Sequence, residues 1–111
     1  MTVTVKVLIP AKIAEATQTT QYTATGVTTL IDKFTATNYS AVAATISVNL
    51  VTSADTAGNN NLIVKTKTLQ AGETYTFPEI VGAALAASGF ISTIAGTATA
   101  INIRASGREI S

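Results

Sequence analysis

The chain has 111 residues, no Cys, no His and a net charge of +1, and only 12% of its residues are charged. This composition excludes disulfides, thiolate nucleophiles, zinc–cysteine sites and any catalytic arrangement that uses histidine as its general base. Because a charged fraction near a quarter is usual, the surface must consist largely of Thr, Ser, Asn and Ala around one modest core.

The first segment of the chain alternates strictly between apolar and polar residues from Thr2 to Ile9, which predicts a β-strand. Val3, Val5, Val7 and Ile9 are expected on one face, and Thr2, Thr4 and Lys6 on the other. Pro10 is expected to end this strand or bend it. Residues 1–16 are therefore an N-terminal arm that pairs with another subunit, or an ordinary edge strand of the body.

Two further strands follow before the middle of the chain. Thr17–Thr25 is polar and β-prone, which indicates an edge strand or a second extended arm. Val27–Thr37 also predicts a strand, but Asp32 shares the parity of the apolar Leu30, Phe34 and Ala36. A β-bulge in this strand would resolve the conflict.

The central strand has the clearest pattern in the chain. Residues 38–40 (Asn-Tyr-Ser) supply turn chemistry before it. The residues expected to point inward are Val42, Ala44, Ile46, Val48 and Leu50, and those expected to point outward are Ala43, Thr45, Ser47 and Asn49. This alternation is typical of a half-buried antiparallel strand.

The second half of the chain predicts shorter elements separated by turns. We expect a loop at Ser53–Asn61, a strand with Leu62 and Val64 opposite Lys65 and Lys67, and a turn at Gln70–Gly72. A short strand at Thr74–Phe77 follows, and Pro78–Gly89 is then a helical turn or an extended crossing. The chain ends in a predicted hairpin of Phe90–Ala95 and Thr97–Ala105, with Ile101 and Ile103 inward. Short strands at near-regular spacing predict an all-β fold. We therefore expect a single domain, residues 1–111, built as an antiparallel β-sandwich or jelly roll.

The six carboxylates offer little for catalysis, since none of them are neighbours in the sequence. A glycosidase needs two carboxylates a few ångströms apart, and Glu73 and Glu79 are the pair that could converge; solvated strand-end carboxylates are the favoured alternative. Asp55 and the asparagines at 59–61 could offer oxygen ligands to calcium, but they lack the spacing of a calcium loop. We expect no enzymatic activity, no metal and no cofactor.

Nucleic-acid and membrane partners are also not expected. The basic residues are scattered, whereas nucleic-acid binding usually requires a clustered positive face. Ile80–Ile103 is uncharged over a length that could span a bilayer, but three glycines and several Ser, Thr and Asn residues interrupt it. The alternation in residues 1–16 also differs from the unbroken apolar run of a secretory signal.

Several segments, in this order and spacing, resemble a β-sandwich module that recurs in virion proteins of tailed bacteriophages. These segments are LIDKFTATNYS, AVAATISVNLV, LQAGETYTFPEIV, ASGFIST and ATAINIRASGREIS. The similarity covers residues 22–111. Residues 2–9 lie outside it, and the Ala-rich stretch at 81–88 is longer than the pattern leads us to expect.

For a chain of this length, the resemblance implies a small capsid decoration (cement) protein. Such a protein is made in the host cytoplasm, lies on the capsid exterior of the virion and clamps neighbouring major capsid subunits, often as a homodimer. A tail, baseplate or fibre component of the same fold is the alternative. A carbohydrate-binding module comes third, since the chain has no Trp and three Tyr residues to offer as platforms for sugars.

Two surfaces are expected to meet partners, and each has a plain structural alternative. The candidate interface residues are Val3, Val5, Val7 and Ile9 in the first strand, and Asp55, Asn59, Asn60 and Leu85 in the central loop and the Ala-rich segment. The first group would form a strand that pairs with another subunit, and the second would contact the shell. The alternatives are an ordinary first strand and ordinary surface loops.

Overall fold

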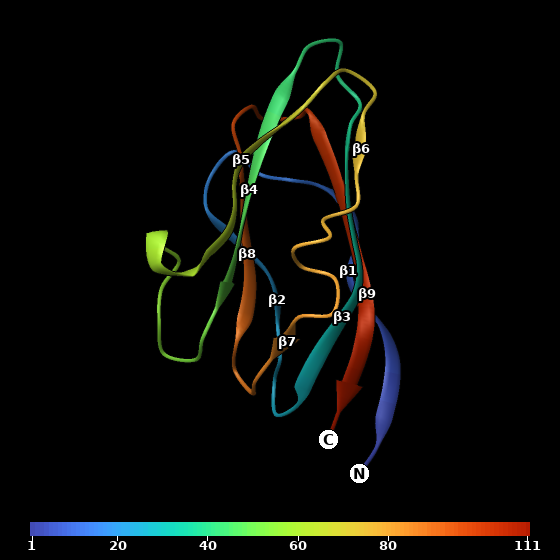
Figure 1. The fold of residues 1–111 in the computed structure, drawn as a ribbon, viewed down its shortest axis with the longest axis vertical. Helices are drawn as coiled ribbons and strands as arrows, with labels where there is room; N and C mark the ends of the chain where they lie inside the picture. The colour runs from blue at the N-terminus through green and yellow to red at the C-terminus, as the bar shows by residue number, and fades with distance from the viewer.

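Two antiparallel β-sheets face each other in the computed structural model, which describes residues 1–111. The elements are β1 (Val3–Ile13), β2 (Thr19–Thr23), β3 (Thr28–Asn38), β4 (Ala44–Val51), the single 3-10 turn η1 (Asn59–Asn61), β5 (Leu62–Leu69), β6 (Thr74–Tyr75), β7 (Ala84–Leu85), β8 (Phe90–Ala95) and β9 (Ile101–Ile110). The strands run along the longest axis of a body that measures 46 × 26 × 20 Å (Figure 1). The predicted all-β sandwich is confirmed.

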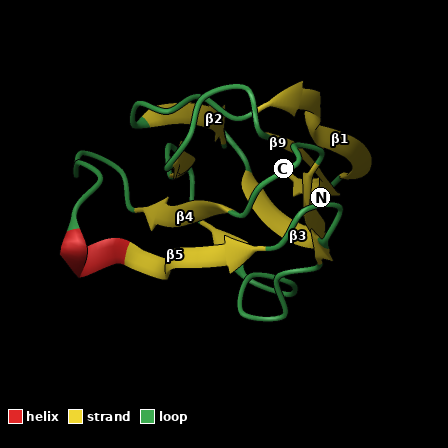
Figure 2. Cartoon of the chain, turned by 90° about the horizontal axis from the view of Figure 1, so that it is seen from above, coloured by secondary structure: helices red, strands yellow, loops and turns green.

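One sheet has the strand order β1-β9-β3-β6, with β7 also paired to β3, and the other has the order β2-β8-β4-β5. Seen from above, β4 and β5 lie to one side of the molecule, and β1, β9 and β3 lie to the other (Figure 2). The chain crosses from the first sheet to the second directly after β1. There the Ala14 amide donates to the Ile101 carbonyl at 2.8 Å, and the Glu15 carbonyl accepts from the Ala95 amide at 2.9 Å.

The bulge predicted in the third strand is confirmed. Ile31 lies opposite Gly107 and Lys33 lies opposite Ser106, which leaves Asp32 as the extra residue of β3. Ile31 and Phe34 are both buried as a result, while Asp32 is exposed. The crowding beside this bulge requires glycine at position 107, because a Cβ there would overlap the Leu30 carbonyl oxygen.

The central strand β4 begins two residues later than its alternation predicts. Val42 lies before β4 and is 66% exposed, so its predicted inward position is wrong. Ser47 and Asn49, expected to face outward to solvent, are instead buried. Both are covered because neighbouring backbone folds over them: Ser47 Oγ accepts from the Thr66 amide at 2.8 Å, and Asn49 Nδ2 donates to the Gly58 carbonyl at 3.0 Å.

The predicted final hairpin is wrong, because β8 and β9 belong to different sheets. β8 pairs with β2 and β4, whereas β9 pairs with β1 and β3. The connection between them starts at Gly96, whose amide donates to the Thr45 carbonyl at 2.9 Å. Ile101 and Ile103 do point inward as predicted. Alternation therefore located the strands, but it carried no information about their partners.

The Ala-rich segment between β6 and β8 begins with one turn and then crosses in extended form, so each of the two predicted alternatives describes part of it. The amides of Ile80 and Val81 both donate to the Phe77 carbonyl, but Gly82 with φ +89° ends this single turn. Gly82 then donates to the Ile31 carbonyl at 2.7 Å. These bonds anchor the segment to β3, so β7 completes the first sheet.

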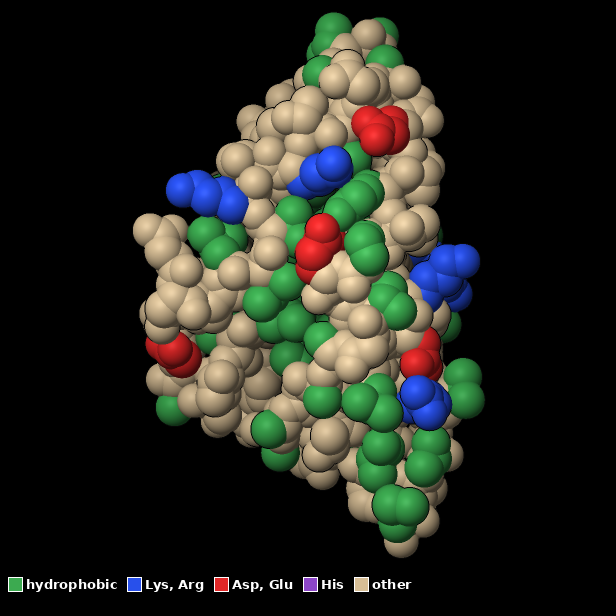
Figure 3. Space-filling view, viewed as in Figure 1, with side chains coloured by type: hydrophobic (Ala, Val, Ile, Leu, Met, Phe, Trp, Pro, Cys, Tyr) green, Lys and Arg blue, Asp and Glu red, His purple; other side chains and the backbone are tan.

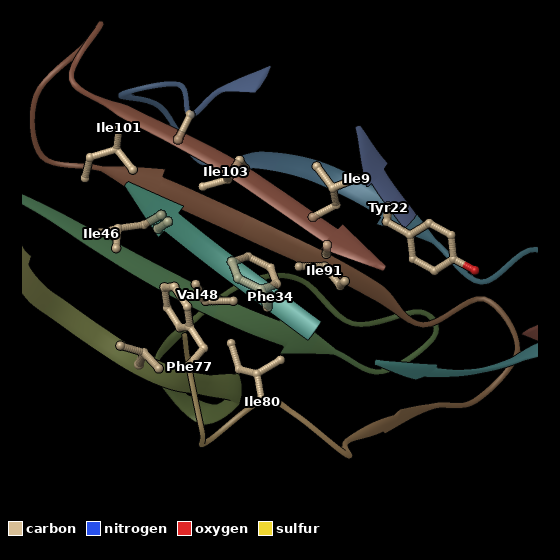
Figure 4. Packing of buried hydrophobic residues seen from close by; sticks show 14 of the residues in the cluster. Ile9, Tyr22, Phe34, Ile46, Val48, Phe77, Ile80, Ile91, Ile101 and Ile103 are labelled. Atoms are coloured by element: carbon tan, nitrogen blue, oxygen red, sulfur yellow. The ribbon is translucent and has the colours of Figure 1, made fainter. Parts of the chain in front are cut away.

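One hydrophobic core fills the space between the two sheets. Its largest fully buried side chains are Ile9, Ile31, Phe34, Ile46, Val48, Val51, Leu69, Phe77, Ile80, Ile91, Ile101 and Ile103. Phe77 packs edge to face against Phe34 and against Tyr75, with ring centroids 4.7 Å apart in each pair. Figure 4 shows part of this core, in which labelled side chains such as Phe34 of β3 and Val48 of β4 approach each other from the two sheets. Burial of each large side chain contributes about 1.5–3 kcal/mol.

Candidate interaction surfaces

The first strand lies at an open edge of its sheet, with β9 on one side and no strand on the other. Thr2 and Ser111 exchange two backbone hydrogen bonds of 2.9 Å, so they form a hydrogen-bonded antiparallel pair. Because such pairs alternate along the ladder, Thr4 and Lys6 also direct their backbone groups toward β9. The amides and carbonyls of Val3, Val5 and Val7 therefore face the open edge.

The side chains of the same three valines are exposed, and we call Val3, Val5 and Val7 the valine edge. They are 51%, 83% and 45% exposed, respectively. They share the outer face of the sheet with their cross-strand partners on β9, Ile110, Arg108 and Ser106. Figure 3 shows hydrophobic side chains gathered at the lower end of the molecule, where Figure 1 places the two termini. Apolar side chains and unpaired backbone groups thus coincide on one strand.

Ile9 does not belong to this surface. The register of β1 shifts between Val7 and Ile9, which makes Leu8 an extra residue, and both Leu8 and Ile9 turn into the core. The predicted common face of Ile9 and the three valines is therefore wrong. β1 also continues through Pro10 to Ile13, with a second irregularity between Ile9 and Lys12. The proline interrupts the ladder without ending the strand.

The second candidate surface is only partly brought together. The end of β4 and the Ala-rich segment border a shallow depression of about 120 Å³, whose lining includes Thr52, Ser53, Leu85, Ala86 and Gly89. Leu85 is 4% exposed and belongs to the hydrophobic core, so its side chain offers almost no surface to a partner. Asp55, Asn59 and Asn60 are exposed but do not line the depression.

Hydrogen bonds within the central loop account for Asp55, Asn60 and Asn61. The Asp55 carboxylate accepts from the Thr56 amide at 2.8 Å and from Asn60 Nδ2 at 3.3 Å. Asn61 Oδ1 accepts from the Gly58 amide at 3.0 Å and from Asn49 Nδ2 at 2.7 Å. The loop is therefore shaped by its own polar side chains and held to β4 by Asn49.

The carboxylates are distributed over separate structural contacts. Glu73 accepts from the Gln70 amide at 2.7 Å, whereas Glu79 accepts from the Tyr75 hydroxyl at 2.6 Å. The bond from Tyr75 lowers the pKa of Glu79, and the same bond raises the pKa of Tyr75. No group of three or more Asp, Glu, His or Cys side chains is placed to hold a metal ion.

A polar cluster that no sequence pattern indicates lies directly inside the valine edge. The Tyr22 hydroxyl donates to Glu109 Oε2 and lies 2.7 Å from Thr29 Oγ1, while Lys6 Nζ lies 3.2 Å from Glu109 Oε2. Burial, and then the contact with Glu109, raises the pKa of Tyr22 to about 12. The bond from Tyr22, followed by those from Lys6, lowers the pKa of Glu109. Lys6 is thus held by Glu109 of its own sheet.

Comparisons with protein-family models, curated proteins and solved structures find no match to this chain. No helix in the structure has the length and hydrophobicity needed to cross a membrane. The structural features that bear on function are therefore the valine edge and the central loop.

Proposed function

We propose that this chain is a structural virion protein that binds the outside of a phage capsid, clamps neighbouring major capsid subunits and stabilises the shell. The observation that carries the proposal is the valine edge. It places three exposed apolar side chains and a row of unpaired backbone groups on one open strand. Such a strand can extend the sheet of another protein, and its apolar surface favours binding by about 25 cal/mol per Å² buried.

The position of the central loop supports a clamp with two separate contacts. Figures 1 and 2 both place η1 and β1 on opposite sides of the sandwich. A homodimer formed through β1 would leave the loops of both copies free at its two ends. Each loop could then contact a different capsid subunit, and two linked contacts bind more tightly than either one alone.

The low charge of the surface also suits broad contact with another protein. The chain has seven basic and six acidic residues, and three ion pairs within the fold engage Lys6, Lys12 and Arg108. Charged residues are depleted in the centres of interfaces, because their desolvation is costly. A surface of Thr, Ala and Asn lowers that cost.

Quantitative mass spectrometry of purified virions tests the proposal. We expect the chain in the particle at a fixed, high ratio to the major capsid protein, and its removal should lower the temperature at which the shell opens. A copy number matching the tail would instead support a tail, baseplate or fibre component. Absence of the chain from the particle would overturn both assignments.

A matched pair of substitutions tests the shell contact. Asn59→Arg adds a bulky charge to the exposed central loop, and Thr97→Arg adds the same charge to the exposed connection between β8 and β9. We expect Asn59→Arg to lower the occupancy of the chain on capsids, and Thr97→Arg to leave it unchanged. Equal occupancy for both variants would reject the loop as the shell contact.

A further inference from the structure

The two sheets have five edge strands, because β6 and β7 both pair with the same side of β3, and only β1 lacks a device that prevents pairing with another chain. β6 and β7 have two residues each, and the register of β2 shifts between Thr20 and Tyr22. β5 carries Lys65 and Lys67, and Thr66 between them has φ +45° and breaks the ladder. Short strands, lysines and bulges are the usual protections of a sheet edge. Residues 3–7 of β1 have no break, and their one lysine is bound to Glu109.

We propose that two copies of this chain pair edge to edge along β1, antiparallel, with Val5 opposite Val5 of the second copy. This inference deepens the proposed function, on whose homodimer it rests. In this register Val3 lies opposite Val7 of the other copy, and Val7 opposite its Val3. Each of these pairs can exchange two hydrogen bonds, because the backbone groups of all three valines face the open edge. The two sheets become one continuous sheet across a two-fold axis.

Other symmetric registers use this edge less well. A pairing centred on Lys6 is disfavoured, because it places the lysines of the two copies directly opposite each other. A pairing centred on Val7 would run into the irregular segment after Leu8, where Pro10 has no amide hydrogen to donate. A pairing centred on Val3 would leave Val7 opposite no residue. Only the register centred on Val5 uses the whole regular segment.

The side chains also agree with this register. The valines of both copies come together as one stripe on the outer face, where cross-strand contacts between β-branched side chains are favourable. On the other face, Lys6 lies opposite Thr4 of the second copy and not opposite its Lys6. With a net charge of +1, each copy repels the other only weakly. The edge is thus complementary to itself in both shape and charge.

Sedimentation equilibrium tests the pairing by comparing the mass in solution of the unmodified chain with that of a proline variant. The chain should associate to twice its mass of 11.3 kDa. In Val5→Pro the fold should persist, because the Val5 amide has no partner within one copy and an edge strand tolerates proline. The dimer should weaken by about 100-fold, since both copies lose a hydrogen bond. Val5→Thr keeps the amide and the branched shape, so it serves as the control that still dimerises.

Single cysteines test the register, because the chain has no cysteine of its own. A hydrogen-bonded pair places its Cα atoms about 5.5 Å apart, within reach of a disulfide. Val5→Cys should therefore cross-link to itself on mild oxidation, and Val3→Cys should cross-link to Val7→Cys when the two variants are mixed. Thr4→Cys is the control. Thr4 lies opposite Lys6 of the second copy, so the Cα atoms of the two Thr4 residues are about 7–8 Å apart.

Three results would overturn the inference: a chain that stays monomeric, a dimer that Val5→Pro does not weaken, or cross-linking of Thr4→Cys as efficient as that of Val5→Cys. If circular dichroism shows that Val5→Pro is unfolded, the cysteine variants decide alone. A monomeric chain present at full occupancy on capsids would overturn the pairing and leave the proposed function intact. A dimer that is absent from virions would support the pairing and overturn the proposed function.

Discussion

The hydroxyl of Tyr22 on β2 donates a hydrogen bond to the carboxylate of Glu109 on β9, and this bond joins the two sheets at the end that carries the valine edge. The same hydroxyl contacts Thr29 on β3, which is fully buried. Three strands and both layers therefore meet at one phenol group. Lys6 of β1, which pairs with β9 here, joins this cluster through its ion pair with Glu109.

Tyr22→Phe should lower the free energy of unfolding by about 2 kcal/mol. The substitution removes a hydrogen bond to a carboxylate and leaves the buried Thr29 hydroxyl without a partner. Urea denaturation measures the change. Tyr39→Phe is the matched control, because Tyr39 is half exposed and its hydroxyl makes no hydrogen bond within the chain. Equal stability of the two variants would contradict the structural role assigned to Tyr22.

Stability should fall at alkaline pH through the same residue. The pKa of Tyr22 is about 12 in the folded chain against an ordinary value of 10.0. Between these values the unfolded chain loses the proton first, so the contribution of Tyr22 is complete below pH 10 and declines as pH rises toward 12. The free energy of unfolding, measured across this range, should decline less steeply in Tyr22→Phe. Identical slopes would refute this assignment.

The acid side of the stability curve should depend on Glu109, whose pKa lies below its ordinary value of 4.5. Its stabilising contribution is present above pH 4.5 and is lost as pH falls through the lowered pKa. Glu109→Gln should therefore flatten the acid decline. Tyr22→Phe should flatten it more than Lys6→Met, because the bond from Tyr22 is the largest cause of the shift. The opposite ranking would show that Lys6 dominates.

Gly107→Ala should destabilise the fold by about 3 kcal/mol, because the added methyl group would overlap the Leu30 carbonyl oxygen and press on Leu8. Gly26→Ala is the matched control. Gly26 has φ +70° but open space around it, so only backbone strain of about 1 kcal/mol is expected there. Thermal unfolding compares the two. A milder effect at Gly107 would mean that the β3 bulge can shift.

Asn38→Asp should cost about 3 kcal/mol. The buried amide of Asn38 donates to the carbonyls of Val42 at 2.8 Å and Leu69 at 2.9 Å. A carboxylate would lose both bonds and face two carbonyl oxygens while buried. Asn102→Asp, on the outer face of β9, changes the same group without breaking a side-chain hydrogen bond and should be nearly neutral. Chemical denaturation distinguishes the two outcomes.

Local patterns in the sequence were sufficient for those parts of the fold that depend on local chemistry. The parity conflict at Asp32 predicted the β3 bulge, and the alternation around Ile101 and Ile103 predicted their burial, because successive side chains of a strand point to opposite faces. The valine edge was also visible as an alternating segment. The sequence did not show that this edge ends at Val7. The extra residue, Leu8, turns Ile9 inward and follows from the pairing of β1 with β9.

Composition and period-two patterning are properties of the chain alone, so they are sufficient to predict an all-β sandwich that has an alternating first strand and no histidine or cysteine chemistry. Three features require the folded structure: β8 and β9 lie in different sheets, Leu85 is a core residue, and Tyr22 contacts Glu109. The last two residues are 87 positions apart. Contacts over such separations depend on how the strands pair, and strand pairing is set by the packing of the whole domain.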